Sequence, residues 1–184
     1  TFGYTGPFTA AARGLVAATT TAGTVADDPG DAFSVGGPGV TAFPVAIPAG
    51  TTYARFALFD ANVSPASDLD LYVTNPAGTL VAASGNGTST EEANLLNPAA
   101  GTYTVHVHGY SVPGTASFTL YSWLLGTTAA GNMAVSAPAT ATTGATGPVT
   151  LTFTGLTPGA KYLGSVAYAG IAGLPTPTLV RVDP

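Results

Sequence analysis

Two aspartates stand two residues apart in the stretch Ser67-Asp68-Leu69-Asp70-Leu71-Tyr72-Val73, and this spacing is the clearest chemical signal in the chain. Successive side chains of a β-strand point to opposite faces, so both carboxylates share one face while the leucines face a core. Paired carboxylates can act as general acid and base, or they can bind a hard cation through oxygen. No convincing catalytic motif accompanies the pair, so we favour a cation or a turn role.

The other acidic residues also cluster. Asp60 ends the preceding predicted strand, a turn-rich loop has the sequence Asp27-Asp28-Pro29-Gly30-Asp31, and Glu91-Glu92 precedes another strand. Calcium takes several oxygen ligands from carboxylates, amides and carbonyls. We therefore predict Ca²⁺ at one of these clusters, with the candidate ligands Asp68, Asp70, Asp60, Asp27, Asp28 and Asp31. The alternative is structural: Asp68 would bind turn amides, and Asp70 would pair with Arg55 or a hydroxyl.

A catalytic triad is not predicted. The nearest candidate for a nucleophile is Ser89 in Gly87-Thr88-Ser89-Thr90, which lies in a predicted turn, and no Gly-x-Ser-x-Gly elbow occurs. His106 and His108 share one face of a predicted strand and adjoin no triad-like motif. Two neighbouring imidazoles can bind zinc, but no third ligand is evident, so we favour a solvated face. We predict that this chain is not itself an enzyme.

Aromatic residues offer a candidate binding surface. Tyr110 follows the two histidines on their face of the strand, and Tyr121 and Trp123 alternate with the residues around them in the next strand. Exposed aromatic side chains dominate many protein-binding surfaces. The candidate residues for binding protein substrate are Tyr110, Tyr121, Trp123, His106 and His108. We favour the alternative, in which this surface packs against the tail of the chain or a neighbouring domain.

Composition narrows the class of protein. The 184 residues carry four basic and nine acidic side chains, for a net charge of −5, and only 7% of the chain is charged. This balance argues against nucleic acid and anionic membranes as partners, because both require basic patches. No cysteine is present, which excludes disulfides and thiolate chemistry. No apolar run reaches the length of a membrane span. The chain begins at Thr1 without an initiator Met, and we expect a piece of a longer protein.

Period-two alternation, broken by Gly and Pro every eight to twelve residues, predicts an all-β protein. We expect a β-sandwich in residues 1–125 and, after a small-residue linker, a smaller immunoglobulin- or fibronectin-like unit in residues 126–184. The second unit is short for a sandwich, so we expect the first domain or the opening segment to complete it. The predicted strands are 9–18, 32–35, 41–47, 53–60, 68–74, 80–84, 92–96, 101–110, 116–125, 133–137, 149–153, 162–168 and 178–182.

Several motifs occur in a characteristic order between about residues 23 and 125. They are Tyr53-Ala54-Arg55-Phe56-Ala57-Leu58-Phe59-Asp60, Asp68-Leu69-Asp70-Leu71-Tyr72-Val73, Pro76-Ala77-Gly78-Thr79-Leu80-Val81, Glu91-Glu92, Pro98-Ala99-Ala100-Gly101-Thr102-Tyr103-Thr104-Val105 and Phe118-Thr119-Leu120-Tyr121-Ser122-Trp123. In this order they resemble the bacterial pre-peptidase C-terminal domain. The tail, including Tyr162-Leu163-Gly164-Ser165-Val166-Ala167-Tyr168, resembles the C-terminus of subtilisin-like (S8) serine peptidases with long extensions.

This resemblance implies a jelly-roll-like sandwich and a non-catalytic C-terminal region of a secreted subtilisin-like protease. Such a region would stabilise or position the enzyme, or engage protein substrate. It also implies extracellular localisation and calcium binding through acidic loops. The expected partners are the protease's catalytic domain and protein substrate, and the expected state is a monomer. The alternative function is a stand-alone, substrate-anchoring or adhesive extracellular module.

Overall fold

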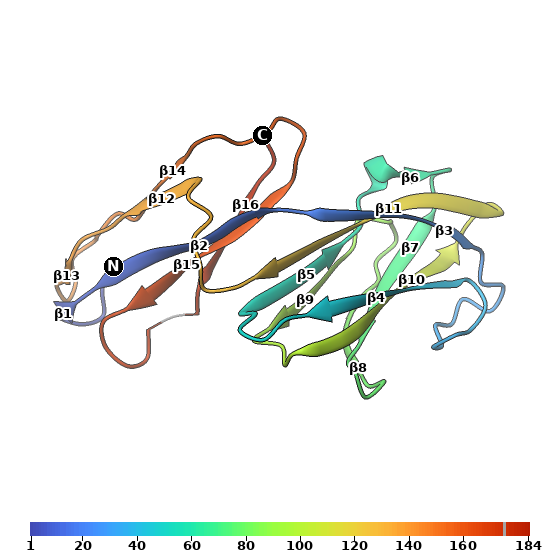
Figure 1. The fold of residues 1–184 in the computed structure, drawn as a ribbon, viewed down its shortest axis with the longest axis horizontal. Coiled ribbons are helices and arrows are strands. Elements are labelled where there is room, and N and C mark those ends of the chain that lie inside the picture. The colour runs from blue at the N-terminus through green and yellow to red at the C-terminus, as the bar shows by residue number, and fades with distance from the viewer. Residues whose placement is uncertain (175) are drawn as a thin grey trace. The chain divides into compact units, whose positions relative to one another are not determined.

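The alternation seen in the sequence becomes a set of antiparallel sheets in the computed structural model, which describes residues 1–174 and 176–184 (Figure 1). Within these residues the only helical element is one 3₁₀ turn, Asp60–Asn62, and no helix could span a membrane. The all-β prediction is confirmed. The chain divides into two units: residues 19–124 form unit 2, and residues 1–18 together with 125–184 form unit 1.

Unit 2 folds as a set of nested strand pairs. Its strands are β3 (Thr19–Ala26), β4 (Val40–Ile47), β5 (Tyr53–Ala57), β6 (Val63–Ser64), β7 (Asp68–Thr74), β8 (Leu80–Ser84), β9 (Glu92–Leu96), β10 (Gly101–Ser111) and β11 (Thr115–Leu125). Leaving out the two-residue β6, the first strand pairs with the last, β4 with β10, β5 with β9, and β7 with β8. The unit is therefore one long hairpin with its tip at the β7–β8 turn.

This long hairpin is wrapped into two sheets with the strand orders β4-β10-β7-β8 and β3-β11-β5-β9. Nested antiparallel pairs shared between two sheets in this way form a jelly roll. The jelly-roll-like sandwich predicted from the sequence is thus confirmed for unit 2.

The core of unit 2 lies between the two sheets and is dominated by aliphatic side chains. On β7, Leu69, Leu71 and Val73 are fully buried, and Val105 and Val107 meet them from β10. Phe56, Phe118 and Leu120 fill the opposite sheet's inner face. The residues between these positions on β7 and β10 must point outward, because side chains alternate along a strand.

The hairpin tip between β7 and β8 follows from local turn chemistry. The side chain of Asn75 accepts hydrogen bonds from the backbone amides of Ala77 and Thr79, and the backbone amide of Gly78 donates to the carbonyl of Asn75. Gly78 has a φ of +80°, a conformation that costs glycine little. The predicted strands 68–74 and 80–84 on either side of this turn are both confirmed.

Unit 2 differs from the predicted strands by more than one residue at four places: β5 ends at Ala57 and not at residue 60, the short strand β6 was not predicted, and the two largest differences lie at residues 32–35 and 19–26. Residues 32–35 form no strand, because they lie in an irregular segment, residues 27–39, which we call the 27–39 loop. Conversely, Thr19–Ala26 forms β3, which the sequence did not reveal. This strand lies at the edge of its sheet and exposes most of its small side chains, so it lacks the alternation by which strands are found.

Unit 1 combines the two ends of the chain. Its strands are β1 (Gly6–Pro7), β2 (Thr9–Ala17), β12 (Met133–Ser136), β13 (Thr140–Ala141), β14 (Thr150–Phe153), β15 (Tyr162–Ala169) and β16 (Thr178–Val182). They form a three-stranded sheet, β16-β15-β2, and the pairs β12-β14 and β1-β13. Its immunoglobulin- or fibronectin-like character stays a prediction.

The opening segment of the chain completes unit 1. The sequence had left two candidates for this role, the first domain and the opening segment. β2 pairs with β15 over its whole length, so residues 1–18 lie in unit 1 and not in the sandwich predicted for residues 1–125. Leu15 of β2 shares a small core with Met133 and Tyr162, which β12 and β15 contribute. The reason is burial: Leu15 is 1% exposed in this core, and Ala12 of the same strand packs against it.

The nested core predicts a large effect for a substitution at its centre. Leu71→Ala should lower the free energy of unfolding of unit 2 by about 3 kcal/mol, because it leaves a cavity in a fully buried site. Urea unfolding followed by the fluorescence of Trp123, the single tryptophan, measures the change. Leu80→Ala is the control, because Leu80 is 49% exposed. Equal costs for the two variants would contradict this account of the core.

Candidate functional site

The outer face of the sheet β4-β10-β7-β8 gathers most of the polar residues singled out in the sequence. His108 lies opposite Asp70 in the β7–β10 register, and His106 lies opposite Tyr72. Because these positions alternate with the buried leucines and valines, all four side chains leave the core on the same side of the sheet. The prediction that Asp68 and Asp70 share a face is confirmed.

The 27–39 loop covers part of this face. Phe33 stacks on Tyr72 with the ring centroids 3.8 Å apart and the planes within 4°, and it meets the rings of His106 and His108 edge-on. Both histidines are buried as a result. The sequence prediction of a solvated histidine face, and of both histidines as exposed binding residues, is therefore wrong. Sequence reasoning missed the cover because Phe33 lies some forty residues or more from the strands it packs on.

His108 connects two carboxylates inside the structure. Its Nε2 lies 3.0 Å from Oδ2 of Asp28, and its Nδ1 lies 3.5 Å from Oδ2 of Asp70. The hydrogen bond from His108 is the main reason why the pKa of Asp28 is lowered, and the amides of Gly30 and Ala32 also lower it. This bridge fixes the 27–39 loop to β7 and β10.

The acidic loop predicted as a calcium site is used for this attachment. Asp28 already accepts hydrogen bonds from two backbone amides and from His108, so its oxygens have little capacity left for a cation. Asp27 accepts a hydrogen bond of 2.7 Å from the amide of Val112. A Cβ on Gly39 would lie 2.7 Å from the backbone nitrogen of Asp28, so the loop closes tightly only with glycine there. Asp31 is exposed. These three residues do not converge.

A second acidic group does converge, at the rim of the same sheet. Asp68, Asp70 and Tyr72 of β7 line an open pocket of about 440 Å³ together with Gly85, Asn86, Gly87 and Tyr110. We call it the acidic pocket. Its carboxylates interact with one another: burial is the main cause that raises the pKa of Asp68, and the nearby charges of Asp70 and Asp60 raise it further.

Glu91 adds a further carboxylate close to this pocket. It is buried, and it accepts hydrogen bonds from the hydroxyl of Ser84 and the amide of Asn86. Burial raises its pKa first, and the charges of Asp70 and Asp68 contribute. Burial also raises the pKa of Tyr72 to about 12, with Asp70 again contributing. The sequence showed Glu91 as part of an acidic pair but gave no sign that it folds back onto Asp70.

One oxygen in the acidic pocket has no hydrogen-bond partner. Oδ1 of Asp68 is buried and unpaired, whereas Asp70 accepts a hydrogen bond from the hydroxyl of Tyr72. Arg55 does not pair with Asp70, because it forms an ion pair of 2.8 Å with Glu92. Among the described residues no three His, Asp or Glu side chains are placed to hold a metal ion by themselves. A cation here would need oxygens from amides, carbonyls or water as well.

The described residues do not contain a catalytic serine arrangement. Ser89 is buried, donates a hydrogen bond of 2.6 Å to the carbonyl of Ser67 and accepts one from the amide of Leu69, so it ties two segments together. His106 contacts the hydroxyl of Thr74, and burial lowers the pKa of His106. Neither histidine has a hydrogen bond to a serine hydroxyl.

The predicted aromatic surface is divided between the two sheets of unit 2. Tyr110 is 41% exposed beside the acidic pocket. Tyr121 is half-buried, stacks on Trp123 and donates a hydrogen bond to the side chain of Asn62. Trp123 is buried, so its prediction as an exposed binding residue is wrong. The sequence could not show this, because both faces of β11 carry large apolar side chains.

Comparison with known proteins agrees with this geometry. Residues 39–109, which run from the residue before β4 into β10, match the family model of the bacterial pre-peptidase C-terminal domain. Over these residues, unit 2 is similar to a pre-peptidase C-terminal domain. The chain is also 40% identical over 82 residues to pyrolysin from Pyrococcus furiosus, in an alignment that covers 41% of this chain. The alignment covers 6% of pyrolysin.

The bridge from Asp28 through His108 to Asp70 in this domain makes a prediction about pH. The pKa of Asp28 is lowered in the folded chain, so its carboxylate stabilises the fold at any pH above 3.8, the ordinary pKa of aspartate. This stabilisation is lost as the pH falls from 3.8 through the lowered pKa of the folded state. His108→Gln should therefore be less stable than the parent chain at pH 7, and the difference should narrow below about pH 4.

Thermal unfolding between pH 2.5 and 7 measures this difference. Leu80→Ala is the control, because it removes an exposed apolar side chain and no titratable group, so its stability difference should not narrow in that range. Parallel stability curves for the parent chain and His108→Gln would show that the bridge contributes nothing.

Proposed function

We propose that this chain is an accessory, non-catalytic region of a secreted, subtilisin-like serine protease. The observation that carries the proposal is the match of residues 39–109 to the pre-peptidase C-terminal domain, whose description places it after a peptidase. The alignment with 6% of pyrolysin also fits a piece of a much longer protein. The structural use of Ser89 and of both histidines is consistent with chemistry supplied elsewhere.

Within such a protease the chain would stabilise or position the catalytic domain. The second candidate is a stand-alone extracellular module that anchors protein substrate. Tyr110 favours it, since this exposed ring lies beside the acidic pocket, on a face that the 27–39 loop covers only in part.

Two measurements on the parent gene test the accessory role. The sequence upstream of Thr1 should encode an Asp, a His and a Gly-Thr-Ser-Met-Ala serine motif. Removing residues 1–184 from the full protein should shorten its half-life at elevated temperature while changing kcat/KM for a short soluble peptide by less than about twofold, because a remote domain does not touch the reacting atoms.

The same deletion separates the two candidate functions. A loss of activity confined to insoluble protein substrates, with an unchanged half-life, would favour the anchoring module. Cleavage of casein by the isolated chain, abolished by a serine-directed inhibitor, would overturn both proposals.

Calcium is a further part of the proposed function, and the acidic pocket is the site that fits it. The unpaired Oδ1 of Asp68 lacks a donor, and the raised pKa of Asp68 reflects burial together with repulsion from Asp70. A cation would relieve both. Asp68 and Asp70 would hold the ion, with water completing the oxygen shell that calcium requires. The Asp27–Asp31 loop does not fit, since the carboxylates of Asp27 and Asp28 are taken by backbone amides and His108, and Asp31 is exposed.

The calcium proposal predicts a thermal shift. Calcium at one hundred times its dissociation constant should raise the midpoint of unfolding by about 5 °C or more, because ligand binding stabilises only the folded state. Asp68→Asn and Asp70→Asn should abolish the shift, whereas Asp31→Asn, in the other acidic cluster, should retain it.

The same variants give a second readout without metal. In a chelator, Asp68→Asn should be more stable than the parent chain at pH 7, because it removes a carboxylate whose raised pKa costs stability when ionised. This gain should fade as the pH falls and should be gone well below pH 3.8, where Asp68 is protonated in both the folded and the unfolded state. Millimolar calcium that shifts neither the parent chain nor Asp31→Asn would exclude the site.

A further inference from the structure

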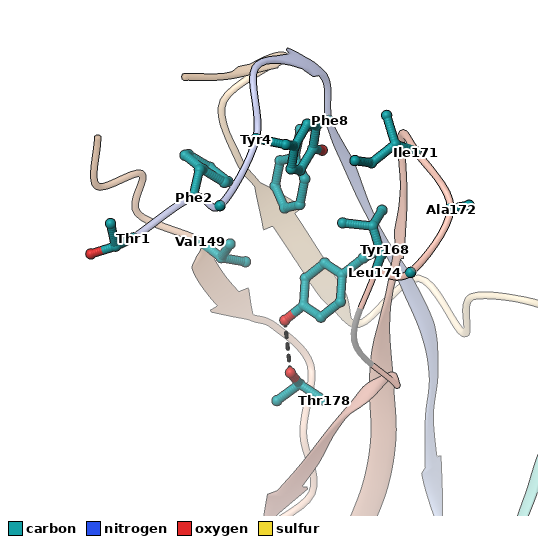
Figure 2. A pocket seen from close by; sticks show the side chains of 12 residues that line it. Thr1, Phe2, Tyr4, Phe8, Val149, Tyr168, Ile171, Ala172, Leu174 and Thr178 are labelled. Atoms are coloured by element: carbon teal, nitrogen blue, oxygen red, sulfur yellow. Dashed lines mark hydrogen bonds between the residues drawn. The ribbon is translucent and has the colours of Figure 1, made fainter. Parts of the chain in front are cut away.

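Unit 1 contains an aromatic pocket that lies outside the residues matched by the pre-peptidase model. Its volume is about 490 Å³, and its walls include the rings of Phe2, Tyr4, Phe8 and Tyr168 (Figure 2). The first three rings come from the opening segment of the chain, and Tyr168 comes from β15. The size falls within the range typical of ligand pockets in proteins.

The backbone around the pocket keeps the rings of Phe2 and Tyr4 in place. Phe2 exchanges two backbone hydrogen bonds with the turn at residues 144–145, through its amide to the carbonyl of Ala145 and through its carbonyl from the amide of Gly144. A Cβ on Gly147 would lie 2.6 Å from the ring of Phe2, so this ring rests against a glycine. The ring of Phe2 is therefore held in one position in the wall of the pocket.

Tyr4 is held by a similar arrangement. Its hydroxyl donates a hydrogen bond of 2.8 Å to the carbonyl of Pro7, and a Cβ on Gly170 would lie 2.7 Å from the same hydroxyl oxygen. Phe8 is held between its neighbours, edge-on to Phe2 at 5.1 Å and stacked on Tyr168 at 5.8 Å. The pocket is thus formed before any ligand arrives, which lowers the entropic cost of binding.

The lining selects an uncharged ligand. None of its side chains is charged, and its apolar rim includes Val149 and Ile171, of which Ile171 is 47% exposed. Its polar groups are mainly hydroxyls. A sugar would bury several hydroxyls against walls without amide or carboxylate partners, and each unpaired group costs about 1–3 kcal/mol.

One pair of hydroxyls in the pocket can donate a hydrogen bond to a peptide carbonyl. The hydroxyls of Tyr168 and Thr178 are hydrogen-bonded to each other at 2.7 Å, so one proton is used between them and the second can be donated (Figure 2). A segment in the polyproline II conformation has carbonyls without internal partners and presents apolar rings to aromatic walls. Aromatic rings beside a hydroxyl donor therefore match such a segment.

We propose that the aromatic pocket of unit 1 binds an uncharged, proline-rich peptide segment, with a proline ring seated among Phe2, Phe8 and Tyr168 and a peptide carbonyl accepting from the Tyr168–Thr178 hydroxyl pair. This proposal does not depend on the calcium proposal or on the protease context. It holds whether or not the parent protein is a protease.

The test uses the full 184-residue chain and a blocked decaproline peptide, with a blocked Gly-Ser decapeptide as the control ligand. Calorimetric titration should give a dissociation constant below 1 mM for decaproline and no binding of the Gly-Ser peptide. Ile171→Asp should weaken binding at least about tenfold, because it places a charge at the apolar rim. Tyr168→Phe should weaken it by about three- to fivefold, as expected for the loss of one hydrogen bond.

A matched surface variant and an aromatic ligand complete the test. Val35→Asp changes a 64% exposed valine of unit 2 and should bind decaproline as the parent chain does. Unchanged thermal midpoints confirm that the variants are folded. The proposal is overturned if decaproline does not bind at millimolar concentration, if Ile171→Asp binds it normally, or if the pocket binds N-acetyltryptophanamide and not decaproline.

Discussion

In unit 2, β7 and β10 are paired in a register that sets Val107 opposite Leu71 and His108 opposite Asp70. The first pair belongs to the core and the second to the covered outer face. A shift of the register by one residue would exchange the two faces, because side chains alternate with a period of two. The closed core and the acidic pocket therefore depend on the same backbone pairing, and the nested strand pairs outside it keep that pairing in place.

The distribution of charge explains why the acidic residues need special partners. Eight of the nine acidic residues lie in unit 2, together with only one of the four basic residues, Arg55. Arg55 forms an ion pair with Glu92, and the imidazole of His108 lies between the carboxylates of Asp28 and Asp70. Asp68 and Glu91 have no basic partner among the described ion pairs, and the pKa of each is raised. Burial and mutual repulsion produce a site with an excess of negative charge, which favours a cation.

Unit 1 forms from a short C-terminal stretch together with the opening segment of the chain. Residues 125–184 supply five strands, and the opening segment supplies β1 and β2, which pair with β13 and β15. The same opening segment supplies three of the aromatic rings in the pocket of unit 1. A single stretch of about eighteen residues thus contributes both to the three-stranded sheet of this unit and to its aromatic pocket.

Much of the fold of unit 2 could be predicted from local pattern. Strands 68–74, 80–84 and 92–96 were found with their correct bounds, because apolar residues alternate within them and Asn, Gly or Pro ends them. The sharing of a face by Asp68 and Asp70 follows from the same alternation. Pattern failed at Thr19–Ala26, an exposed edge strand of small residues, and at 32–35, where Phe33 is held in a loop by contacts with distant residues.

The sequence by itself determined the class of fold, the faces of the main strands and the likeness to a known domain. Only the tertiary structure decided which polar groups are available for chemistry. His106 and His108 are the right residue types for a site, yet Phe33 and Asp28 bury them, while Asp68 keeps an oxygen without a partner. The physical reason is that alternation fixes the direction of a side chain, whereas its burial, hydrogen bonds and pKa depend on segments that arrive from elsewhere in the chain.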